Sequence, residues 1–326
     1  MRNRLWMSGV VLALVAAGCG AQRSSSSDGG TAAGGGGGGG GDCGEVVINE
    51  QSWVGSTANV YVAKNVLENE LGCTVSITKI AENPVFEAMS DGKVDVILED
   101  WQHTDLYKKY VDDLGKVKQA GSLGVTGHIG WYLPQYLVDE NPDLATWQGV
   151  AENWEMFQTP ESGDKGQFLS GDPSYVTNDE SLINTLDLNF KVIFAGGEAS
   201  EIAAIKQTYA QEEPLLFYWY EPQWLNAALD FEEVKLPKRT KGCDTNPDKV
   251  SCAYPNYDLR KLMSTEFAES GSPAVQFVKN FKWSNADQEL VSQQIAGEKV
   301  SPEDAAAQWL SDNKDKADAW LEGISS

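Results

Sequence analysis

Residues 45–80 of this chain read EVVINEQSWVGSTANVYVAKNVLENELGCTVSITKI. Two short apolar runs, Glu45–Asn49 and Val75–Ile80, flank a longer segment, Thr57–Leu71, whose apolar residues recur with the period of an α-helix. Gly72, directly after that segment, is placed to end the helix. The stretch therefore predicts a strand, a helix and a second strand, which is the repeating unit of an α/β fold.

The same alternation continues along the chain. A short helix is expected from Pro84 to Met89 and a third strand at Val94–Glu99. Further strands are expected at Gly127–Leu133, Lys191–Phe194 and Pro214–Tyr220, and further helices after Glu180, at Glu198–Ala210 and at Pro302–Gly323. We see no internal repeat and no phosphate-binding glycine pattern. The fold class is therefore α/β, built around mostly parallel sheets.

The N-terminus is typical of an exported protein. Arg2 and Arg4 precede an apolar run, Leu5–Ala17, which is too short to cross a membrane and remain there. The residues before Cys19 are small and resemble a bacterial lipobox, in which a lipid is attached to the cysteine. We therefore expect residues 1–18 to be a signal peptide and Cys19 to be lipidated, the alternative being ordinary cleavage that leaves Cys19 without a role.

A segment of low complexity follows Cys19. Residues 19–42 contain Ser24–Ser27 and an unbroken glycine run, Gly34–Gly41, and such a composition cannot bury a core. A flexible chain of this length spans on the order of 25–30 Å. This arrangement predicts a tether, with an extracytoplasmic domain held at the cell membrane by its lipid alone.

Charge and cysteine content restrict the partners and the compartment. The formal net charge of −23 argues against nucleic acid as a partner. Of five cysteines, four remain once Cys19 is assigned to lipid, and an even number in an exported protein suggests disulfides, with three possible pairings. Cys243 and Cys252 bracket a polar loop, whereas Cys43 and Cys73 each precede a predicted strand. We expect both pairs to be bonded, the second if its two strands are neighbours.

An enzymatic function has little support in the sequence. The two histidines, His103 and His128, are not part of a cluster with zinc spacing, and no Gly-x-Ser-x-Gly motif occurs. Paired acidic residues are frequent, but 48 Asp and Glu residues make such pairs expected by chance. We therefore expect no catalytic residue, no metal and no cofactor.

Aromatic residues at strand ends are the most informative feature. Trp53, Trp101 and the pair Trp219-Tyr220 each lie at or near the end of a predicted strand, where α/β sheets bind ligands. Aromatic faces attract a quaternary ammonium by cation–π interaction, at roughly 0.5–2 kcal/mol for each ring. The helix N-terminus at Gly55-Ser56-Thr57 would offer amides to a carboxylate on the same ligand. The alternative is that these side chains only fill the core.

Five segments together resemble the glycine betaine/proline betaine-binding proteins of ABC importers. The resemblance extends from about Val46 to Gly323. The segments are Trp53–Ser56, Phe86–Val96 followed by Trp101, Gly130–Pro134, Gly171–Tyr175 and Phe217–Trp224, the last resembling the family's W-x-P-x-W element.

The resemblance implies the residues of an aromatic cage. Trp53, Trp101, Tyr175 and Tyr220 match positions of ligand-contacting aromatic residues in the family, although Tyr220 and Tyr175 replace tryptophans. Two further candidates are Tyr132 and Trp219, the latter as a substitute for Tyr220. Thr57 stands roughly where the family has a histidine that helps to bind carboxylate, so the exact ligand is left open.

The resemblance also implies a fold of two α/β lobes with the ligand in the cleft between them, the type II periplasmic-binding-protein fold. Residues 43–131 and 230–326 would form one lobe and residues 132–229 the other. The protein would be a monomer that delivers glycine betaine, or a related quaternary-ammonium compound, to the membrane subunits of an ABC importer. Choline, carnitine or an unrelated solute such as an amino acid are alternative ligands, and an exported two-domain enzyme or sensor is the alternative class.

Overall fold

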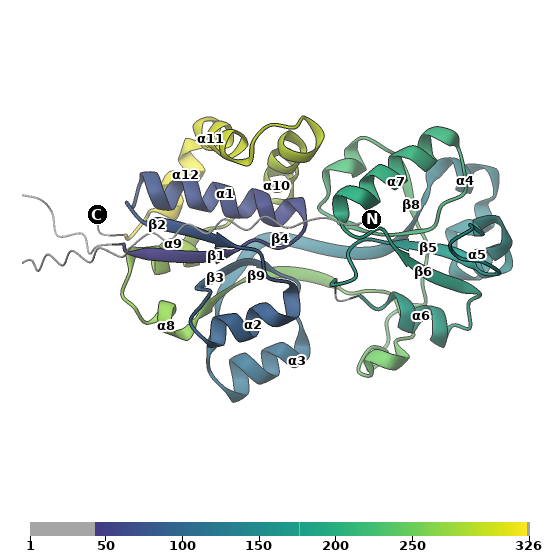
Figure 1. Cartoon of the computed structure of the whole chain (residues 1–326), viewed down its shortest axis with the longest axis horizontal. Coiled ribbons are helices and arrows are strands. Elements are labelled where there is room, and N and C mark those ends of the chain that lie inside the picture. Colours follow the sequence, from purple (N-terminus) through teal and green to yellow (C-terminus); the bar gives the residue numbers. More distant parts are fainter. Residues whose placement is uncertain (1–42, 176, 325–326) are drawn as a thin grey trace, which may run out of the picture. The chain divides into compact units, whose positions relative to one another are not determined.

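The computed structural model describes residues 43–175 and 177–324, which all belong to one compact unit (Figure 1). The strands are β1 (Glu45–Asn49), β2 (Thr74–Thr78), β3 (Val96–Asp100), β4 (Val117–Pro134), β5 (Gly166–Ser170), β6 (Phe190–Phe194), β7 (Phe217–Glu221), β8 (Phe231–Glu233) and β9 (Asn256–Ser264). The expected signal peptide (residues 1–18), Cys19 and the expected tether (residues 19–42) lie outside the described residues.

The helices alternate with these strands. They are α1 (Val54–Asn69), α2 (Glu82–Ser90), α3 (Thr104–Leu106), α4 (Gln135–Glu140), α5 (Trp147–Glu152), α6 (Asp179–Thr185), α7 (Glu198–Gln211), α8 (Thr265–Ala268), α9 (Pro273–Asn280), α10 (Asn285–Ser292), α11 (Pro302–Asp312) and α12 (Lys314–Trp320). Short 3₁₀ or π segments are Tyr107–Asp113, Pro142–Ala145, Trp154–Phe157, Trp224–Ala227, Pro247–Lys249 and Gln293–Gly297. In the first lobe, α1 and α10–α12 cover one face of the sheet, and α2, α3 and α8 cover the other (Figure 1).

One mixed sheet runs through both lobes. Its order is β2-β1-β3-β9-β4-β7-β5-β6, with β8 paired to β4. The pairs β1–β2, β1–β3, β5–β6 and β5–β7 are parallel, as the strand–helix repeats predict, whereas β9 and β4 pair antiparallel with their neighbours. The sheet is thus parallel within each lobe and antiparallel in the middle, because the two central strands carry the chain between the lobes in opposite directions.

Strand β4 carries the chain from the first lobe to the second. Its first part, Val117–His128, pairs with β9, and His128–Tyr132 pairs with β7. Val125 on β4 belongs to the core of the first lobe, together with residues of β1, β3 and α1, whereas Ile129 and Trp131 belong to the core of the second. A single strand therefore fixes the positions of the two cores relative to each other.

The return connection leaves the second lobe later than residue 230. Val234, Val250 and Tyr254 pack in the core of the second lobe, and the Tyr254 hydroxyl donates a hydrogen bond to Asp179 Oδ1 at 2.7 Å. Leu259 is already in the core of the first lobe. We therefore propose crossings near residues 126–128 and 255–257, in place of the limits 131/132 and 229/230 that the resemblance implied.

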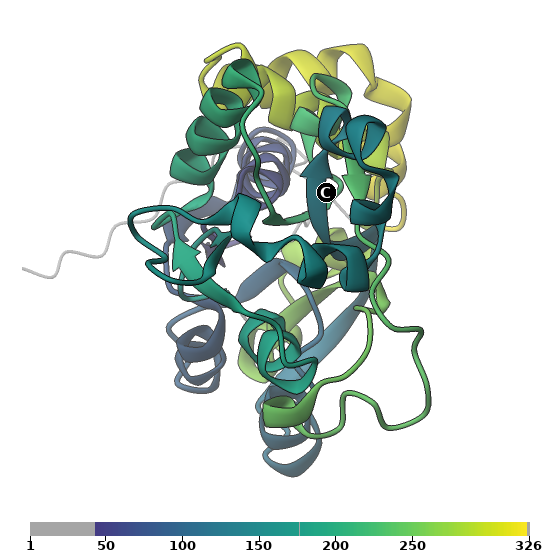
Figure 2. The same ribbon diagram turned by 90° about the vertical axis from the view of Figure 1, so that its right-hand side faces the viewer.

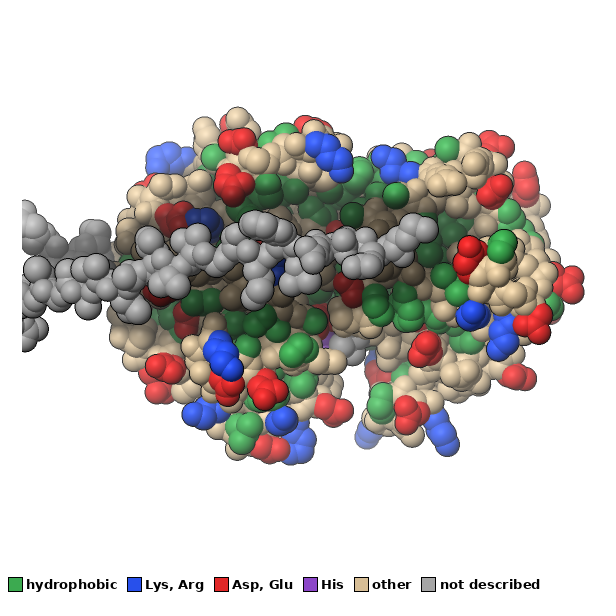
Figure 3. Space-filling model, in the orientation of Figure 1, with side chains coloured by type: hydrophobic (Ala, Val, Ile, Leu, Met, Phe, Trp, Pro, Cys, Tyr) green, Lys and Arg blue, Asp and Glu red, His purple; other side chains and the backbone are tan. Residues whose placement is uncertain are grey.

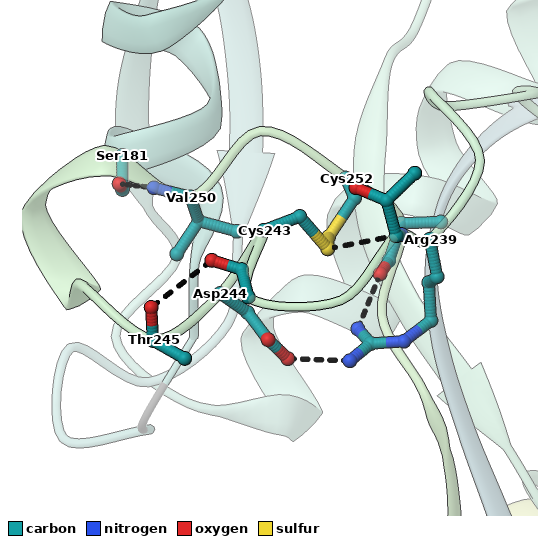
Figure 4. Close-up of a disulfide and its surroundings, with 10 residues drawn as sticks. Ser181, Arg239, Cys243, Asp244, Thr245, Val250 and Cys252 are labelled. Carbon is teal, nitrogen blue, oxygen red and sulfur yellow. Dashed lines mark hydrogen bonds and ion pairs between the residues drawn. A yellow bond between two sulfur atoms is a disulfide. The ribbon is translucent and has the colours of Figure 1, made fainter.

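Both expected disulfides are present. The Cα atoms of Cys43 and Cys73 are 4.8 Å apart, immediately before the paired strands β1 and β2. Those of Cys243 and Cys252 are 5.9 Å apart and close a surface loop, in which the Arg239 guanidinium is paired with Asp244 (Figure 4). This loop projects from the second lobe (Figure 2).

The C-terminal helices supply an aromatic part of the first core. Trp283, Trp309 and Trp320 are buried, and the rings of Trp309 and Trp320 stack at 5.7 Å with an interplanar angle of 6°. These tryptophans belong to the core of the first lobe. Acidic and basic side chains are spread over the periphery of the face shown in Figure 3. Within the described part of the chain, no helix is long and apolar enough to span a membrane.

Candidate functional site

An aromatic pocket lies where the two cores meet. The space around its lining is ≈ 340 Å³, a volume that includes open solvent. The first lobe contributes Trp53 before α1, Glu82 at the start of α2 and Trp101 after β3. The other lining side chains are Ile129 of β4, Tyr175 after β5, and Tyr218 and Tyr220 of β7. Trp101 and Tyr175 follow the carboxyl ends of strands, where ligands bind in α/β folds.

Five aromatic side chains form a nearly closed series around the pocket. Trp53 contacts Tyr175, with ring centroids 5.9 Å apart and planes at 75°. Tyr175 is 6.1 Å from Tyr218, which is 6.3 Å from Tyr220. Tyr220 meets Trp101 edge to face at 5.8 Å. The series begins and ends with the two tryptophans of the first lobe, and three tyrosines of the second lobe lie between them.

The carboxylate of Glu99 joins the two ends of this series. The indole N–H groups of Trp53 and Trp101 donate hydrogen bonds to Glu99 Oε1 at 2.7 and 3.0 Å. Asn59 and Gln288 donate to Oε2 at 2.6 and 2.7 Å. A single buried acceptor therefore holds both tryptophans in fixed orientations, which pre-organises the pocket.

Glu99 lies in a strongly desolvated position. The residue is 1% exposed, and burial raises the pKa of its carboxyl to about 7, although the four hydrogen bonds oppose this shift. A cation in the pocket would favour the ionised form, because opposite charges attract strongly where water is excluded. The site therefore couples the protonation of Glu99 to the charge of whatever fills the pocket.

A second buried carboxylate connects the lobes. Glu198, the first residue of α7, accepts a hydrogen bond from the Tyr220 hydroxyl and one from Gln223 Nε2 at 3.0 Å. Its other oxygen accepts from the Val54 backbone N–H at 2.8 Å, at the first turn of α1 in the opposite lobe. Burial raises the pKa of Glu198. The bond to Val54 holds the lobes together beside the pocket.

Four of the aromatic residues predicted from the sequence line the pocket, and two do not. Trp53, Trp101, Tyr175 and Tyr220 are lining residues. Tyr132 and Trp219 are buried in a separate cluster with Phe217, on the other face of the sheet. Side chains alternate between the faces of a strand, so Trp219 cannot replace its neighbour Tyr220.

The helix terminus predicted to bind a carboxylate does not line the pocket. Ser56 Oγ accepts a hydrogen bond from the Gln51 N–H at 2.9 Å, and Thr57 Oγ1 donates to Glu50 Oε1 at 2.8 Å. A Cβ atom on Gly55 would lie 2.3 Å from Gln288 Nε2. Gly55 is therefore required for the close approach of Gln288 to Glu99. It affects the pocket indirectly, through the carboxylate that orients the two tryptophans.

Sequence reasoning missed Glu82, Ile129 and Tyr218. Tyr218 lies two positions before Tyr220 on β7, so the period of a strand could have placed both on one face. Glu82 and Ile129 had no comparable signal, because isolated acidic and apolar residues are common in this chain. Within residues 43–175 and 177–324, no group of three or more potential ligands could hold a metal ion.

A two-lobed α/β fold with an aromatic pocket between the lobes defines a solute-binding receptor of the periplasmic-binding-protein class. The chain belongs to the family described as the substrate binding domain of the ABC-type glycine betaine transport system, whose model matches residues 44–312. This family consists of binding domains of importers.

One relative in sequence and two solved structures are similar to this chain over most of its length. The chain is 25% identical over 281 residues to the "Trimethylamine N-oxide-binding protein" of Pelagibacter ubique (strain HTCC1062), covering 82% of this chain and 88% of the relative. An ABC-transporter choline-binding protein in complex with choline has a TM-score of 0.70 at 18% identity, with 87% of this chain and 93% of that chain covered. Lactococcal OpuAC, closed on glycine betaine, has a TM-score of 0.68 at 16% identity, with coverage of 85% and 99%. At these identities the two structures establish the fold.

Proposed function

We propose that the pocket binds a compact trimethylated ammonium compound, with Trp53, Trp101, Tyr175, Tyr218 and Tyr220 as its walls. The observation that carries this proposal is the series of five aromatic rings closed by Glu99. A trimethylammonium group cannot donate hydrogen bonds, so ring faces and a nearby negative charge are the groups that can bind it. Glycine betaine is the ligand named by the family, and choline, carnitine and trimethylamine N-oxide share the same head group.

The contact energies expected for this pocket are sufficient to bind a small cation. Three or four cation–π contacts contribute about 2–6 kcal/mol in total. The two tryptophans are already oriented by Glu99, so little conformational entropy is lost when a ligand enters. Contributions from both lobes also mean that the ligand favours their closed arrangement.

Calorimetric titration of the purified protein with glycine betaine, choline, carnitine, trimethylamine N-oxide and glycine tests this proposal. We expect binding of at least one trimethylated compound and none of glycine. Trp53→Ala and Tyr218→Ala should each weaken binding by about 1–3 kcal/mol. Tyr136→Ala, a tyrosine of the second lobe outside the pocket, serves as the matched control. Unchanged affinity in both pocket variants would refute the cage.

We further propose that the receptor is an extracytoplasmic lipoprotein, with residues 1–18 removed and Cys19 lipidated, that acts as a monomer at the importer. The support is the sequence pattern at residues 2–19 and the tether that follows. Radiolabelled palmitate should be incorporated into the protein in cells and not into a Cys19→Ser variant. Label that persists in Cys19→Ser would contradict the assignment.

A further inference from the structure

His128 lies at the point where β4 passes from one lobe to the other. Along β4 it is opposite Asn256 of β9 on one side and opposite Glu221 of β7 on the other. The pairing with the return crossing therefore ends at His128, and the pairing with the second lobe begins there. The next residue, Ile129, lines the pocket and is opposite Tyr220, another lining residue. The position of His128 thus affects both the connection between the lobes and the part of the pocket that β4 and β7 form.

The imidazole of His128 bonds to two segments that are far apart in the chain. Its Nδ1 lies 2.8 Å from Asn256 Oδ1, at the start of β9, and its Nε2 lies 2.9 Å from Glu233 Oε1, at the end of β8. Val234, next to Glu233, is in the core of the second lobe, whereas β9 carries the chain back to the first. A single side chain therefore joins the second lobe to the return crossing.

Both partner atoms are hydrogen-bond acceptors, which favours a charged imidazole. The two ring nitrogens donate together only when both carry a proton. The carboxylate of Glu233 also strengthens its bond through its charge. The hydrogen bond to Glu233 raises the pKa of His128 against the desolvation that lowers it, and the charge of Glu233, the bond to Asn256 and the charge of Glu221 raise it further. These groups of β8, β9 and β7 therefore favour the imidazolium.

The first-lobe side of the same crossing is held by a group that does not titrate. Asn285, the first residue of α10, accepts a hydrogen bond from the Thr126 N–H at 2.9 Å and donates one to the Thr126 carbonyl at 2.8 Å. Residue 126 is thus bound to the first lobe, and His128 is bound to the second. Because hinge motions are absorbed by a few residues, a change in the angle between the lobes strains the bonds of His128.

We propose that His128, as the imidazolium, is a positioning residue that joins β8 to β9 at the crossing and holds the lobes in the arrangement that encloses the pocket. The proposal rests on the proposed function, because the effect of His128 is on retention of the ligand, which it does not contact. This contribution is present below the ordinary pKa of 6.5 and is lost as pH rises through the raised pKa of the folded protein. The side chains of His128 and Glu233 are 25% and 43% exposed, so solvent and salt screen the pair and the effect is severalfold.

The protonation of His128 is measured first, without a ligand. The chain has two histidines, His103 and His128, so His128→Gln assigns the imidazole signals in an NMR titration. We expect the pKa of His128 to lie above 6.5 in wild-type protein and to fall in Glu233→Gln, while His103 titrates identically in both. A wild-type value at or below 6.5, which does not depend on the folding of any variant, would overturn the proposal.

The effect on the lobes is then measured as a rate of ligand release. Stopped-flow dissociation of each trimethylated compound that binds is compared in wild type, His128→Gln, Glu233→Gln and the double variant. Below pH 6.5 each single variant should release the ligand about threefold faster than wild type, and the double variant no faster than either. Well above the pKa that NMR gives, the four rates should agree. Glu99 titrates in the same range but is present in all four proteins, so its effect cancels.

A matched control and the distinct outcomes complete the test. Asp113→Asn removes an exposed ion pair with Lys108 in the first lobe and should leave the release rate unchanged. If no trimethylated compound binds, the proposed function is wrong, and the NMR titration alone decides whether His128 is the imidazolium. If ligands bind but the four proteins release them equally below pH 6.5, or differ as much above the pKa of His128, then His128 does not hold the lobes together.

Discussion

Glu99 shows how one residue determines the geometry of a pocket that it does not line. Its Oε1 accepts hydrogen bonds from the indoles of Trp53 and Trp101, and its Oε2 accepts from two side-chain amides. A tryptophan ring whose N–H is bound can rotate little, so the ring face remains available to a ligand. The cost is a carboxyl group in a dry environment, which is reflected in its pKa of about 7.

This raised pKa makes a prediction about stability. Above the unfolded pKa of 4.5 the unfolded chain releases the proton, whereas the folded protein retains it up to about pH 7. The contribution of Glu99 to the unfolding free energy therefore decreases as pH rises through this window, by about 3 kcal/mol in total. In Glu99→Gln the side chain does not titrate, so the stability of the variant relative to wild type should increase between pH 4.5 and 8. Urea denaturation at both pH values measures this change, and a difference that does not depend on pH would contradict it.

The space around Trp101 is determined by another residue outside the lining. A Cβ atom on Gly127 would lie 2.5 Å from Cζ3 of the indole. Gly127 therefore leaves room for the ring next to β4, where any larger side chain would displace it. The missing side chain is as important to the shape of the pocket as the residues that line it.

At the scale of elements, β7 illustrates what could be predicted from the sequence. The run at its position contains Phe217, Tyr218, Trp219 and Tyr220, all buried. Recognising a strand there is sufficient to assign alternate residues to opposite faces, and one known pocket residue then identifies the other. The structure places Tyr218 and Tyr220 in the pocket and the other two in a separate cluster. Trp219, the expected substitute for Tyr220, lies outside the pocket because neighbouring residues of a strand point to opposite faces.

Strand β4 illustrates what could not be predicted. The sequence indicates a strand only over residues 127–133, whereas the strand spans Val117–Pro134. Gly121 and Gly124 have positive φ angles, and the register with β9 shifts between residues 119 and 121 and between residues 122 and 126. Glycines and polar residues are typical of loops, so a bulged strand of this kind has no clear signal in a single sequence. The crossings that we propose between the lobes have no clear signal for the same reason, because they lie on β4 and at the start of β9.

The residues of the pocket also include some that could be predicted from the sequence and some that could not. Its tryptophans follow apolar strands or precede a helix, so their positions could be inferred from the order of elements. Its carboxylates could not, because 48 acidic residues are spread over the chain and only the fold selects Glu82, Glu99 and Glu198. The aromatic part of the site is thus readable from local sequence, whereas its electrostatics depend on contacts between residues far apart in the chain.

For the molecule as a whole, aromatic contacts and a buried hydrogen bond join the two lobes beside the pocket. Trp53–Tyr175 and Trp101–Tyr220 join residues of opposite lobes. Glu198 adds the bond to the Val54 N–H and also binds the Tyr220 hydroxyl. The same carboxylate thus contacts a wall of the pocket and the opposite lobe.

Glu198→Gln should therefore release the ligand faster. An amide has one acceptor oxygen in place of two, so it cannot bind the Val54 N–H and the Tyr220 hydroxyl together as well as the carboxylate does. A lost hydrogen bond to a charged group costs about 1.5–3 kcal/mol, which corresponds to roughly a tenfold to hundredfold higher dissociation rate if the loss affects only the closed state. Stopped-flow measurement of tryptophan fluorescence after dilution of the complex gives this rate. Glu213→Gln, exposed just beyond the end of α7, is the matched control. Equal rates in wild type and Glu198→Gln would mean that the aromatic contacts alone hold the lobes closed.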